Sequence, residues 1–352
     1  MAKRHWMIYG ANGYTGHLLA AEAQRQGLRP LLAGRNPAAV HALGSLLGLE
    51  CRVFDLHQRE AVVEALADVA VLAHCAGPFS ATSAPMLEAC LASATHYLDI
   101  SGEIDVFEAA HGYHHKAHQL GLVVCPGVGF DVIPSDCLAA CLHQALPDAC
   151  ELALGFDSAG GLSPGTAKTL VEGLALGGRV RRRSMLDPVP LGYKRQRIDF
   201  GRGAKPAMTI PWGDVATAYF STGIGNVEVY VPAPPALAIG LRLLDPLRPL
   251  LGLDAVQRWL KHLVDKRVQG PDQASRERQR TWLWGEARNA AGSRRTARLE
   301  TANGYQVTVH GVLLAVGHLL DYSGPGGYFT PSRLLGERCV EQLPGSGKIV
   351  IS

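Results

Sequence analysis

The sequence lacks the features that mark several classes of protein. None of its eight cysteines forms a Cys-x-x-Cys pair, and this distribution favours buried, reduced thiols in a cytosolic protein. No apolar run reaches the ~20 residues of a membrane-spanning helix, and no signal-type stretch precedes the first predicted strand. The formal net charge of +3, without a long basic run, argues against nucleic acid as a partner. We therefore expect a cytoplasmic protein that is not exported.

One catalytic motif is also missing. None of the ten tyrosines is followed four residues later by lysine, so the Tyr-x-x-x-Lys mechanism of short-chain dehydrogenases is excluded. The chain has 352 residues. Because this is longer than a domain with a single hydrophobic core usually is, the length predicts two domains. Strand and helix patterns alternate over residues 1–148, which predicts an α/β domain with a doubly wound parallel sheet of the Rossmann type. Residues 149–303 show alternating strands and a change of composition, and predict a second, α+β domain.

A glycine-rich turn follows the first predicted strand, residues 6–9. Gly10, Gly13 and Gly16 lie between this strand and a helical pattern, the context in which a dinucleotide is bound. Gly10 allows a sharp turn, Gly13 lets the backbone approach the pyrophosphate, and Gly16 removes a side chain where helix and strand touch. The cofactor's phosphates then meet the N–H groups at the start of the helix.

The end of the second predicted strand, residues 30–33, indicates which cofactor is bound. NAD enzymes place an acidic residue there to bind the ribose 2′-hydroxyl. This chain has Arg35, whose fixed positive charge suits a 2′-phosphate. The sequence therefore predicts NADP(H). Asn36 and Pro37 predict the N-cap and first residue of the next helix.

Two loops after later strands are expected to lie at the nicotinamide end of the cofactor. Gly77–Phe79 and Gly127–Asp131 both follow apolar strands of the predicted parallel sheet, whose carboxyl ends bind ligands. Their glycines are expected to leave room for a flat ring. Asp131 is a candidate proton donor, although it could equally orient its loop, and Ser135 could cap the following helix. Tyr97, in the polar cluster at residues 97–103, is the second candidate.

Four histidines suggest a metal site at first sight. His111, His114, His115 and His118 have the spacing of one helical face. The helix is expected between two strands of the sheet, where its outer face is solvated, so we expect a polar surface and no metal.

A leucine-rich insertion spans residues 234–268. Leucines and basic residues alternate in it, and Pro246 and Pro249 break any long helix. A basic amphipathic segment of this kind can lie on a membrane or cover an apolar substrate, or it can pack against its own domain or a dimer partner.

Taken together, these motifs resemble the saccharopine dehydrogenase-like oxidoreductases, and within that group the trans-acting enoyl reductase branch. The resemblance rests on Gly10–Gly16, Ala76–Phe79, Tyr97–Glu103, Pro126–Asp136, Trp284–Ala287 and Thr330-Pro331. It implies an NADP-binding domain completed by C-terminal helices (304–352), and a middle domain for substrate and dimerisation. It also implies that Ala76–Phe79 lies beside the nicotinamide ribose and Asp55 near the adenine. The residues expected to contact the cofactor are Gly10, Asn12, Gly13, Tyr14, Thr15, Gly16, Arg35, Asp55, Ala76, Gly77, Pro78 and Phe79.

The sequence thus predicts an NADPH-dependent reductase of an α,β-unsaturated acyl or other lipid-like substrate. Two alternatives remain: an amino-acid or imine dehydrogenase of the saccharopine type, and a non-catalytic NADP- or lipid-binding protein. The expected partners are a small molecule and, at residues 234–268, a membrane surface or a second copy of the chain.

Overall fold

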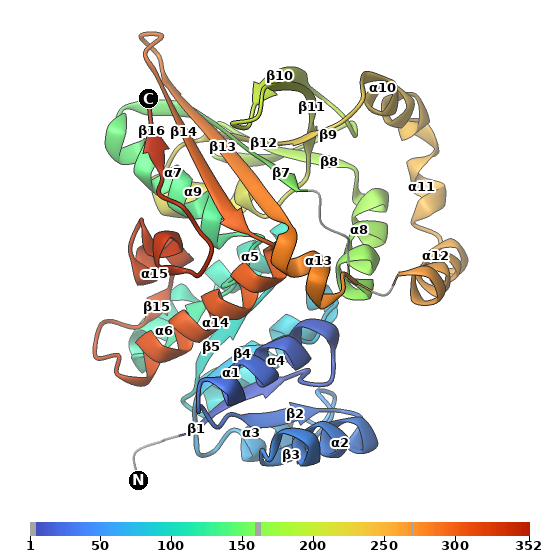
Figure 1. The fold of residues 1–352 in the computed structure, drawn as a ribbon, viewed down its shortest axis with the longest axis vertical. Coiled ribbons are helices and arrows are strands. Elements are labelled where there is room, and N and C mark those ends of the chain that lie inside the picture. The colour runs from blue at the N-terminus through green and yellow to red at the C-terminus, as the bar shows by residue number, and fades with distance from the viewer. Residues whose placement is uncertain (1–4, 159–162, 269) are drawn as a thin grey trace. The chain divides into compact units, whose positions relative to one another are not determined.

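The computed structural model describes residues 5–158, 163–268 and 270–352. They form two compact units, each assembled from two separate parts of the chain (Figure 1). The first unit contains the residues up to Phe130 together with Tyr305–Leu335, and the second contains Asp131–Gly304 together with Gly336–Ser352. Among the described residues, no helix is both long and apolar enough to cross a membrane.

The first unit is a doubly wound parallel sheet, as predicted. Its strands lie in the order β15-β6-β5-β4-β1-β2-β3. The strands are β1 (His5–Tyr9), β2 (Leu31–Gly34), β3 (Cys51–Val53), β4 (Val69–His74), β5 (His96–Asp99), β6 (Val123–Cys125) and β15 (Gly327–Tyr328). The helices are α1 (Tyr14–Arg25), α2 (Pro37–Leu47), α3 (Arg59–Ala65), α4 (Phe79–Ala92), α5 (Ile104–His111), α6 (His114–Leu120), α14 (Gly304–Leu320) and α15 (Pro331–Leu335). The order reverses beside β1, which pairs with both β2 and β4, and ligands bind such sheets at this point.

Local signals in the sequence explain where the second helix begins and ends. The Asn36 side chain accepts a hydrogen bond from the backbone of Ala39 at 3.2 Å, and Pro37 is the first residue of α2. Gly48 ends the helix with a φ of 64°, a conformation that glycine adopts without a steric penalty. The predicted N-cap is therefore confirmed.

The second unit is built around a mixed sheet in the order β10-β11-β12-β7-β13-β14-β16, with β8 attached to β12 and β9 to β8. Its strands are β7 (Ala149–Ser158), β8 (Gly178–Arg182), β9 (Met185–Val189), β10 (Arg195–Asp199), β11 (Ala204–Ile210), β12 (Asn226–Pro232), β13 (Arg280–Asn289), β14 (Arg294–Ala302) and β16 (Val350–Ile351). Its helices include α7 (Ile133–Ala145), α8 (Pro164–Leu176), α9 (Asp214–Thr222) and α13 (Gln273–Arg278), and a 3-10 turn spans Cys339–Gln342. The sequence predicts an α+β second domain, and the structure shows one.

The leucine-rich insertion forms a chain of short helices in the second unit. These are α10 (Pro235–Leu244), a 3-10 turn (Asp245–Leu247), α11 (Arg248–Leu251) and α12 (Asp254–Arg267). The prolines at 246 and 249 break the helix as expected. On α12, Lys261 forms an ion pair with Glu172 of α8 at 2.5 Å, and Gln257 donates to the Val171 carbonyl at 3.1 Å. These contacts fix α12 to α8.

The units differ from the ranges expected from the sequence. The predicted boundary at residue 148 separates α7 from the second domain, whereas the structure places α7 in the second unit. The reason is packing, because α7 is buried from Ile133 to Leu142 and contacts β13, β14 and α9. The C-terminal part is also divided: Tyr305–Leu335 completes the first unit, and Gly336–Ser352 adds β16 to the second sheet.

Candidate functional site

The glycine turn of the first unit has the geometry that a dinucleotide needs. Gly10 has a φ of 83°, which a residue with a side chain rarely adopts. Gly13 is the N-cap of α1, and this helix, described over its whole length, has neither a side-chain cap nor an acidic residue in its first turn. The start of α1 is therefore open to a negatively charged group, such as the cofactor's pyrophosphate.

Gly16 allows the close contact between helix and turn that the sequence predicts. A Cβ at this position would lie 2.2 Å from the Gly10 carbonyl oxygen, far inside van der Waals contact. We expect Gly16→Ala to displace α1 from the turn and to lower NADPH affinity at least tenfold, as measured by fluorescence titration. Gly317→Ala is the matched control, because Gly317 lies on the exposed face of α14 with no described atom near its Cβ position. Unchanged binding by the Gly16 variant would contradict this role.

Arg35 follows β2 directly, at the strand end where sheets of this kind bind the ribose of a dinucleotide. Its side chain is exposed. Asn12 reaches the same place, since its Oδ1 lies 2.9 Å from where a Cβ on Gly34 would be. Asp55 lies near this edge after β3 and accepts a hydrogen bond from the His57 backbone at 3.0 Å. Burial raises the pKa of Tyr9 to about 12, with a contribution from the Asp55 charge, so the two side chains are close.

The loop Ala76–Phe79 is held from two sides. The Thr82 hydroxyl donates to the Ala76 carbonyl at 2.7 Å, and Glu103 accepts hydrogen bonds from the backbone of Phe79 (3.0 Å) and Ser80 (2.7 Å). Glu103 therefore occupies the start of α4, whereas the start of α1 stays open beside β1. Phe79 is buried and its ring contacts His74 edge-on.

Tyr97 belongs to a buried polar network. Its hydroxyl donates to Asp99 at 2.8 Å, and Asp99 also accepts from Ser101 and from the Gly127 backbone at 2.8 Å. Burial raises the pKa of Tyr97 well above its usual value, and the Asp99 carboxylate adds to this. The network joins the carboxyl ends of β5 and β6. Of the two predicted proton donors, Tyr97 already has a hydrogen-bond partner, because its hydroxyl donates to Asp99.

Asp131 is the first residue of the second unit. Its backbone carbonyl accepts a hydrogen bond from the Trp212 indole at 3.0 Å, which fixes the segment leading into α7. Burial raises the pKa of its carboxyl to about 7. The group can therefore be protonated near neutral pH, as a general acid requires. Ser135 does not cap α7, because the helix begins at Ile133 and the Ser135 hydroxyl donates to the Val132 carbonyl.

The second unit contains two further carboxyl groups, which no sequence motif indicated as candidates. Asp214, at the start of α9, is completely buried, and the Ser135 side chain lies next to its carboxyl group. Burial raises its pKa well above the usual value, and the charges of Asp136 and Asp131 add to the effect. Asp136 is buried too and accepts a hydrogen bond from Ser221 of α9. No sequence spacing links these residues, because only the packing of α7 against α9 brings them together.

Two sequence interpretations need correction. Gly129 does not leave room for a ring: a Cβ there would lie 3.0 Å from the Thr308 side chain of α14, so this glycine permits helix packing. The histidines do not lie on one solvated helix, because α5 ends at His111 and α6 begins at His114. The nitrogen of His114 accepts from the Tyr328 backbone at 3.2 Å, and this ties α6 to β15.

Comparison with known proteins agrees with this geometry. Residues 6–125 match the saccharopine dehydrogenase NADP binding domain. A Mycobacterium tuberculosis protein named for trans-acting enoyl reductase activity is 26% identical over 407 aligned positions, covering 97% of this chain and 95% of that protein. A mitochondrial saccharopine dehydrogenase-like oxidoreductase of Arabidopsis thaliana is 30% identical over 147 residues, covering 37% of this chain and 32% of that protein.

Solved structures show the same fold at low sequence identity. Saccharopine dehydrogenase (L-Glu forming) from Saccharomyces cerevisiae aligns with a TM-score of 0.66 and 12% identity, covering 99% of both chains. Homospermidine synthase from Legionella pneumophila aligns with a TM-score of 0.65 and 10% identity, covering 99% of this chain and 91% of that one. The first unit is thus an NADP-binding domain. Residues 6–125 are similar to the NADP-binding domain of saccharopine dehydrogenase, and both units share the fold of that enzyme.

Proposed function

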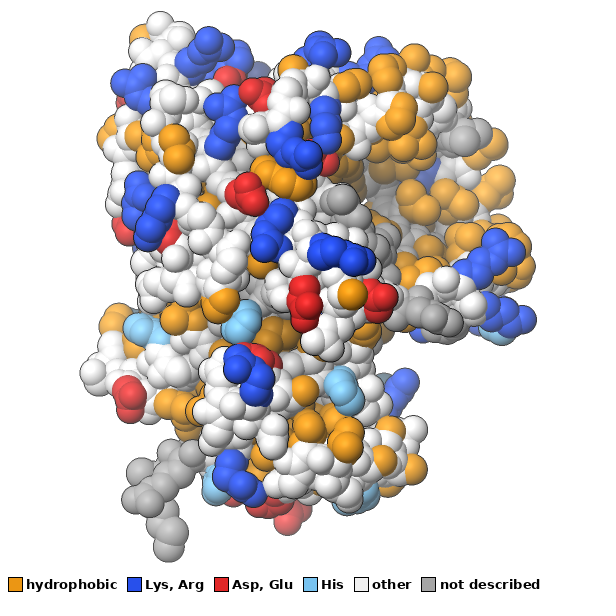
Figure 2. All heavy atoms as spheres, in the orientation of Figure 1, with side chains coloured by type: hydrophobic (Ala, Val, Ile, Leu, Met, Phe, Trp, Pro, Cys, Tyr) orange, Lys and Arg blue, Asp and Glu red, His pale blue; other side chains and the backbone are white. Residues whose placement is uncertain are grey.

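We propose that this oxidoreductase reduces an α,β-unsaturated acyl substrate of lipid-like character at an anionic membrane surface. The observation that carries this proposal is the exposed apolar side of the insertion helices. The side chains that project into solvent there are Leu237, Ile239, Leu243, Leu247, Leu250, Leu253 and Trp259. Figure 2 shows hydrophobic side chains gathered over α10, α11 and α12. Isolated exposed leucines are common, but a cluster of this size is typical of a binding surface.

The insertion has an inner and an outer side. Leu241 packs toward a small core of Met208, Ala233 and Ala238, and this contact anchors α10 to the second sheet. Leu243 and Trp259 are 74% and 59% exposed, so they contribute little to that core. Packing within the domain therefore does not explain why the outer positions are apolar, whereas contact with an external apolar partner does.

Charge favours a lipid surface as that partner. Arg242, Arg258, Lys266 and Arg267 are all exposed on the same helices. A helix that combines apolar and cationic side chains lies in the plane of a membrane, with its leucines among the acyl chains and its cations near anionic headgroups. Such a position also gives access to substrates that are poorly soluble in water.

In this reaction the chain's own residues donate a proton and bind the cofactor. NADPH, when bound, supplies a hydride to the β-carbon of the substrate. Asp131 donates the proton that the α-carbon needs, because a pKa of about 7 leaves a substantial fraction of this carboxyl protonated at neutral pH. The turn of Gly10–Gly16 binds the cofactor's pyrophosphate, and Arg35 binds the 2′-phosphate on its adenosine side.

Turnover measurements test the reaction class. NADPH oxidation is followed with 2-enoyl thioesters of increasing chain length and, separately, with an amino acid and a 2-oxo acid that condense to an imine. Reduction that strengthens with acyl length supports the proposal. Reduction of the imine mixture alone would assign a saccharopine-type dehydrogenase, and absence of turnover with either would overturn enoyl reduction.

A triple variant tests the membrane contact. We expect Leu243→Gln, Leu247→Gln and Trp259→Gln together to lower binding to vesicles containing anionic phospholipid at least tenfold, since each exposed side chain contributes on the order of 1 kcal/mol on burial. Flotation with vesicles measures this. Leu46→Gln is the matched control, because Leu46 is 72% exposed on α2 of the other unit. Unchanged flotation, or a change from dimer to monomer in the triple variant, would assign the outer leucines to a protein contact instead.

A further inference from the structure

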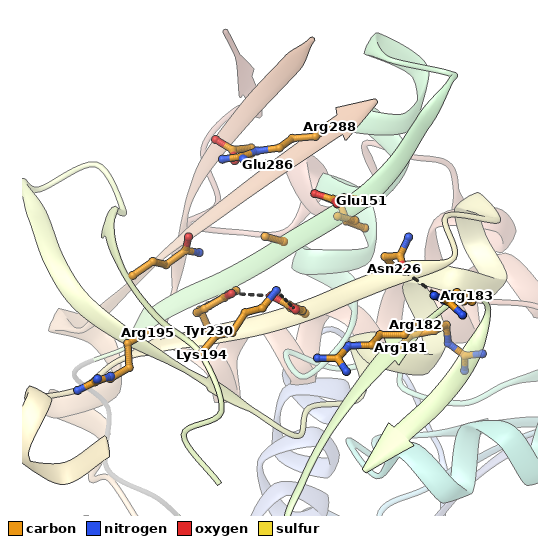
Figure 3. A pocket seen from close by; sticks show the side chains of 14 residues that line it. Glu151, Arg181, Arg182, Arg183, Lys194, Arg195, Asn226, Tyr230, Glu286 and Arg288 are labelled. Carbon is orange, nitrogen blue, oxygen red and sulfur yellow. Dashed lines mark hydrogen bonds and ion pairs between the residues drawn. The ribbon is translucent and has the colours of Figure 1, made fainter. Parts of the chain in front are cut away.

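The second sheet has a hollow of about 400 Å³ on one face, a volume typical of small-molecule sites. Gly285 of β13 faces the other side of the sheet, toward Leu142 of α7. Because side chains alternate along a strand, its neighbours Glu286 and Arg288 face the hollow. Strands β7, β8, β10 and β12, the β8–β9 turn and Lys194, just before β10, supply the rest of the lining (Figure 3). The hollow lies entirely within the second unit.

The lining is rich in positive charge. It includes Arg181, Arg182, Arg183, Lys194, Arg195 and Arg288, against three acidic side chains, Glu151, Glu228 and Glu286. Two of the three acids are neutralised from within, because Lys194 pairs with Glu228 and Arg288 with Glu286, each at 2.5 Å. The excess of cations makes the hollow attractive to an anion.

Most of these cations have partners in the described part of the chain, and two do not. Arg181 is buried against the Tyr219 ring and donates to the Val215 carbonyl at 2.7 Å, so it is structural. Arg182 pairs with Asp187 at 2.8 Å. The guanidinium groups of Arg183 and Arg195 have no hydrogen bond or ion pair among the described residues, and they lie toward opposite ends of the hollow (Figure 3).

The backbone at Arg183 and Ser184 has a conformation that residues with side chains rarely adopt. Arg183 and Ser184 have φ values of 47° and 67°, in a two-residue turn where glycine and asparagine are usual. Hydrogen bonds compensate for this, from the Arg183 backbone to Asn226 at 3.1 Å and from the Ser184 backbone to the Gly225 carbonyl at 2.9 Å. The turn therefore holds Arg183 at the edge of the hollow in a fixed backbone conformation.

We propose that this hollow binds a small polyanion with negatively charged groups at both ends, either phosphates or carboxylates. Arg183 and Arg195 each bind one end, since a guanidinium matches both kinds of group with two parallel hydrogen bonds. Lys194 and Tyr230, which lie between them in Figure 3, contact the middle of the ligand. This site is separate from the NADP-binding turn and does not depend on the acyl substrate proposed above.

Calorimetric titration tests the proposal, with one equivalent of NADP⁺ present so that the cofactor site is filled. Tripolyphosphate and citrate are the two probes, at low ionic strength. We expect at least one to bind, and Arg183→Ala with Arg195→Ala to weaken that binding at least tenfold. Arg278→Ala is the control for non-specific loss of charge, because it removes one positive charge from an exposed position on α13; each single variant of Arg183 and Arg195 is compared with it.

The pattern of binding identifies the ligand's chemistry. Binding of tripolyphosphate alone assigns phosphate groups, binding of citrate alone assigns carboxylates, and binding of both assigns recognition by charge. If neither probe binds, or if the Arg278 variant loses as much affinity as the double variant, the hollow is not a polyanion site. Turnover of the acyl substrate is measured in the same variants, and its retention keeps the two proposals distinguishable.

Discussion

Arg35→Asp is expected to lower NADPH affinity by roughly 10- to 150-fold, because a charged hydrogen bond contributes about 1.5–3 kcal/mol. We expect the exposed guanidinium after β2 to bind the 2′-phosphate and an aspartate at this position to repel it. NADH has no such phosphate, and an acidic residue at this position can accept a hydrogen bond from its ribose. Its affinity is therefore expected to rise or stay the same. Calorimetry with both cofactors measures the change in preference.

A second arginine serves as the control for this experiment. Arg59→Asp makes the same change of charge at the exposed start of α3 in the same unit. It is expected to leave the ratio of the two affinities within about twofold, since an exposed charge that does not contact the 2′-phosphate acts on both cofactors alike and is screened by salt. Equal binding of NADPH and NADH by the unmodified protein would remove Arg35 as the determinant of cofactor choice.

Asp131→Asn is expected to lower the turnover number by about 10²- to 10⁴-fold, the usual contribution of a general acid. NADPH affinity should change little, because the residues expected to contact the cofactor do not include Asp131. Steady-state kinetics with the best enoyl substrate measures the first effect, and fluorescence titration measures the second. Asp131→Glu, which keeps the carboxyl group, should recover part of the rate.

The pH profile provides a readout that a structural role for Asp131 would not change. Burial raises the pKa of this carboxyl to about 7, so the protonated form is present below that pH and is lost above it. Turnover should therefore be constant at lower pH and fall about tenfold per pH unit above 7. The residual activity of Asp131→Asn should lack this fall. If the variant keeps both the rate and the pH dependence, another group donates the proton.

The sheet and the cofactor could be predicted from the sequence because their signals are local. Each apolar strand, its glycine turn and the following helix lie within about 30 residues, and Gly10, Gly16 and Arg35 act through their own backbone or charge. The cap at Asn36 and the breaks at Pro246 and Pro249 are equally local. Short-range sterics and hydrogen bonding determine such features, so one sequence is enough to see them.

Other features depend on which segments pack together. Gly129 is opposite Thr308, Cys137 touches Cys339 at 3.4 Å, and the carboxyls of Asp136 and Asp214 are buried by the packing of α7 on α9. The polyanion hollow likewise draws its charges from five strands, the β8–β9 turn and the residue before β10. No spacing in the sequence encodes these neighbours.

The sequence by itself determined the parallel sheet, the NADP-binding turn and the amphipathic character of residues 234–268. Only the tertiary structure decided which leucines of that segment are exposed, which unit contains α7, and which carboxyl groups are buried. The physical reason is that burial and desolvation are properties of a packed environment. They shift a pKa or expose an apolar side chain according to neighbours that are distant along the chain.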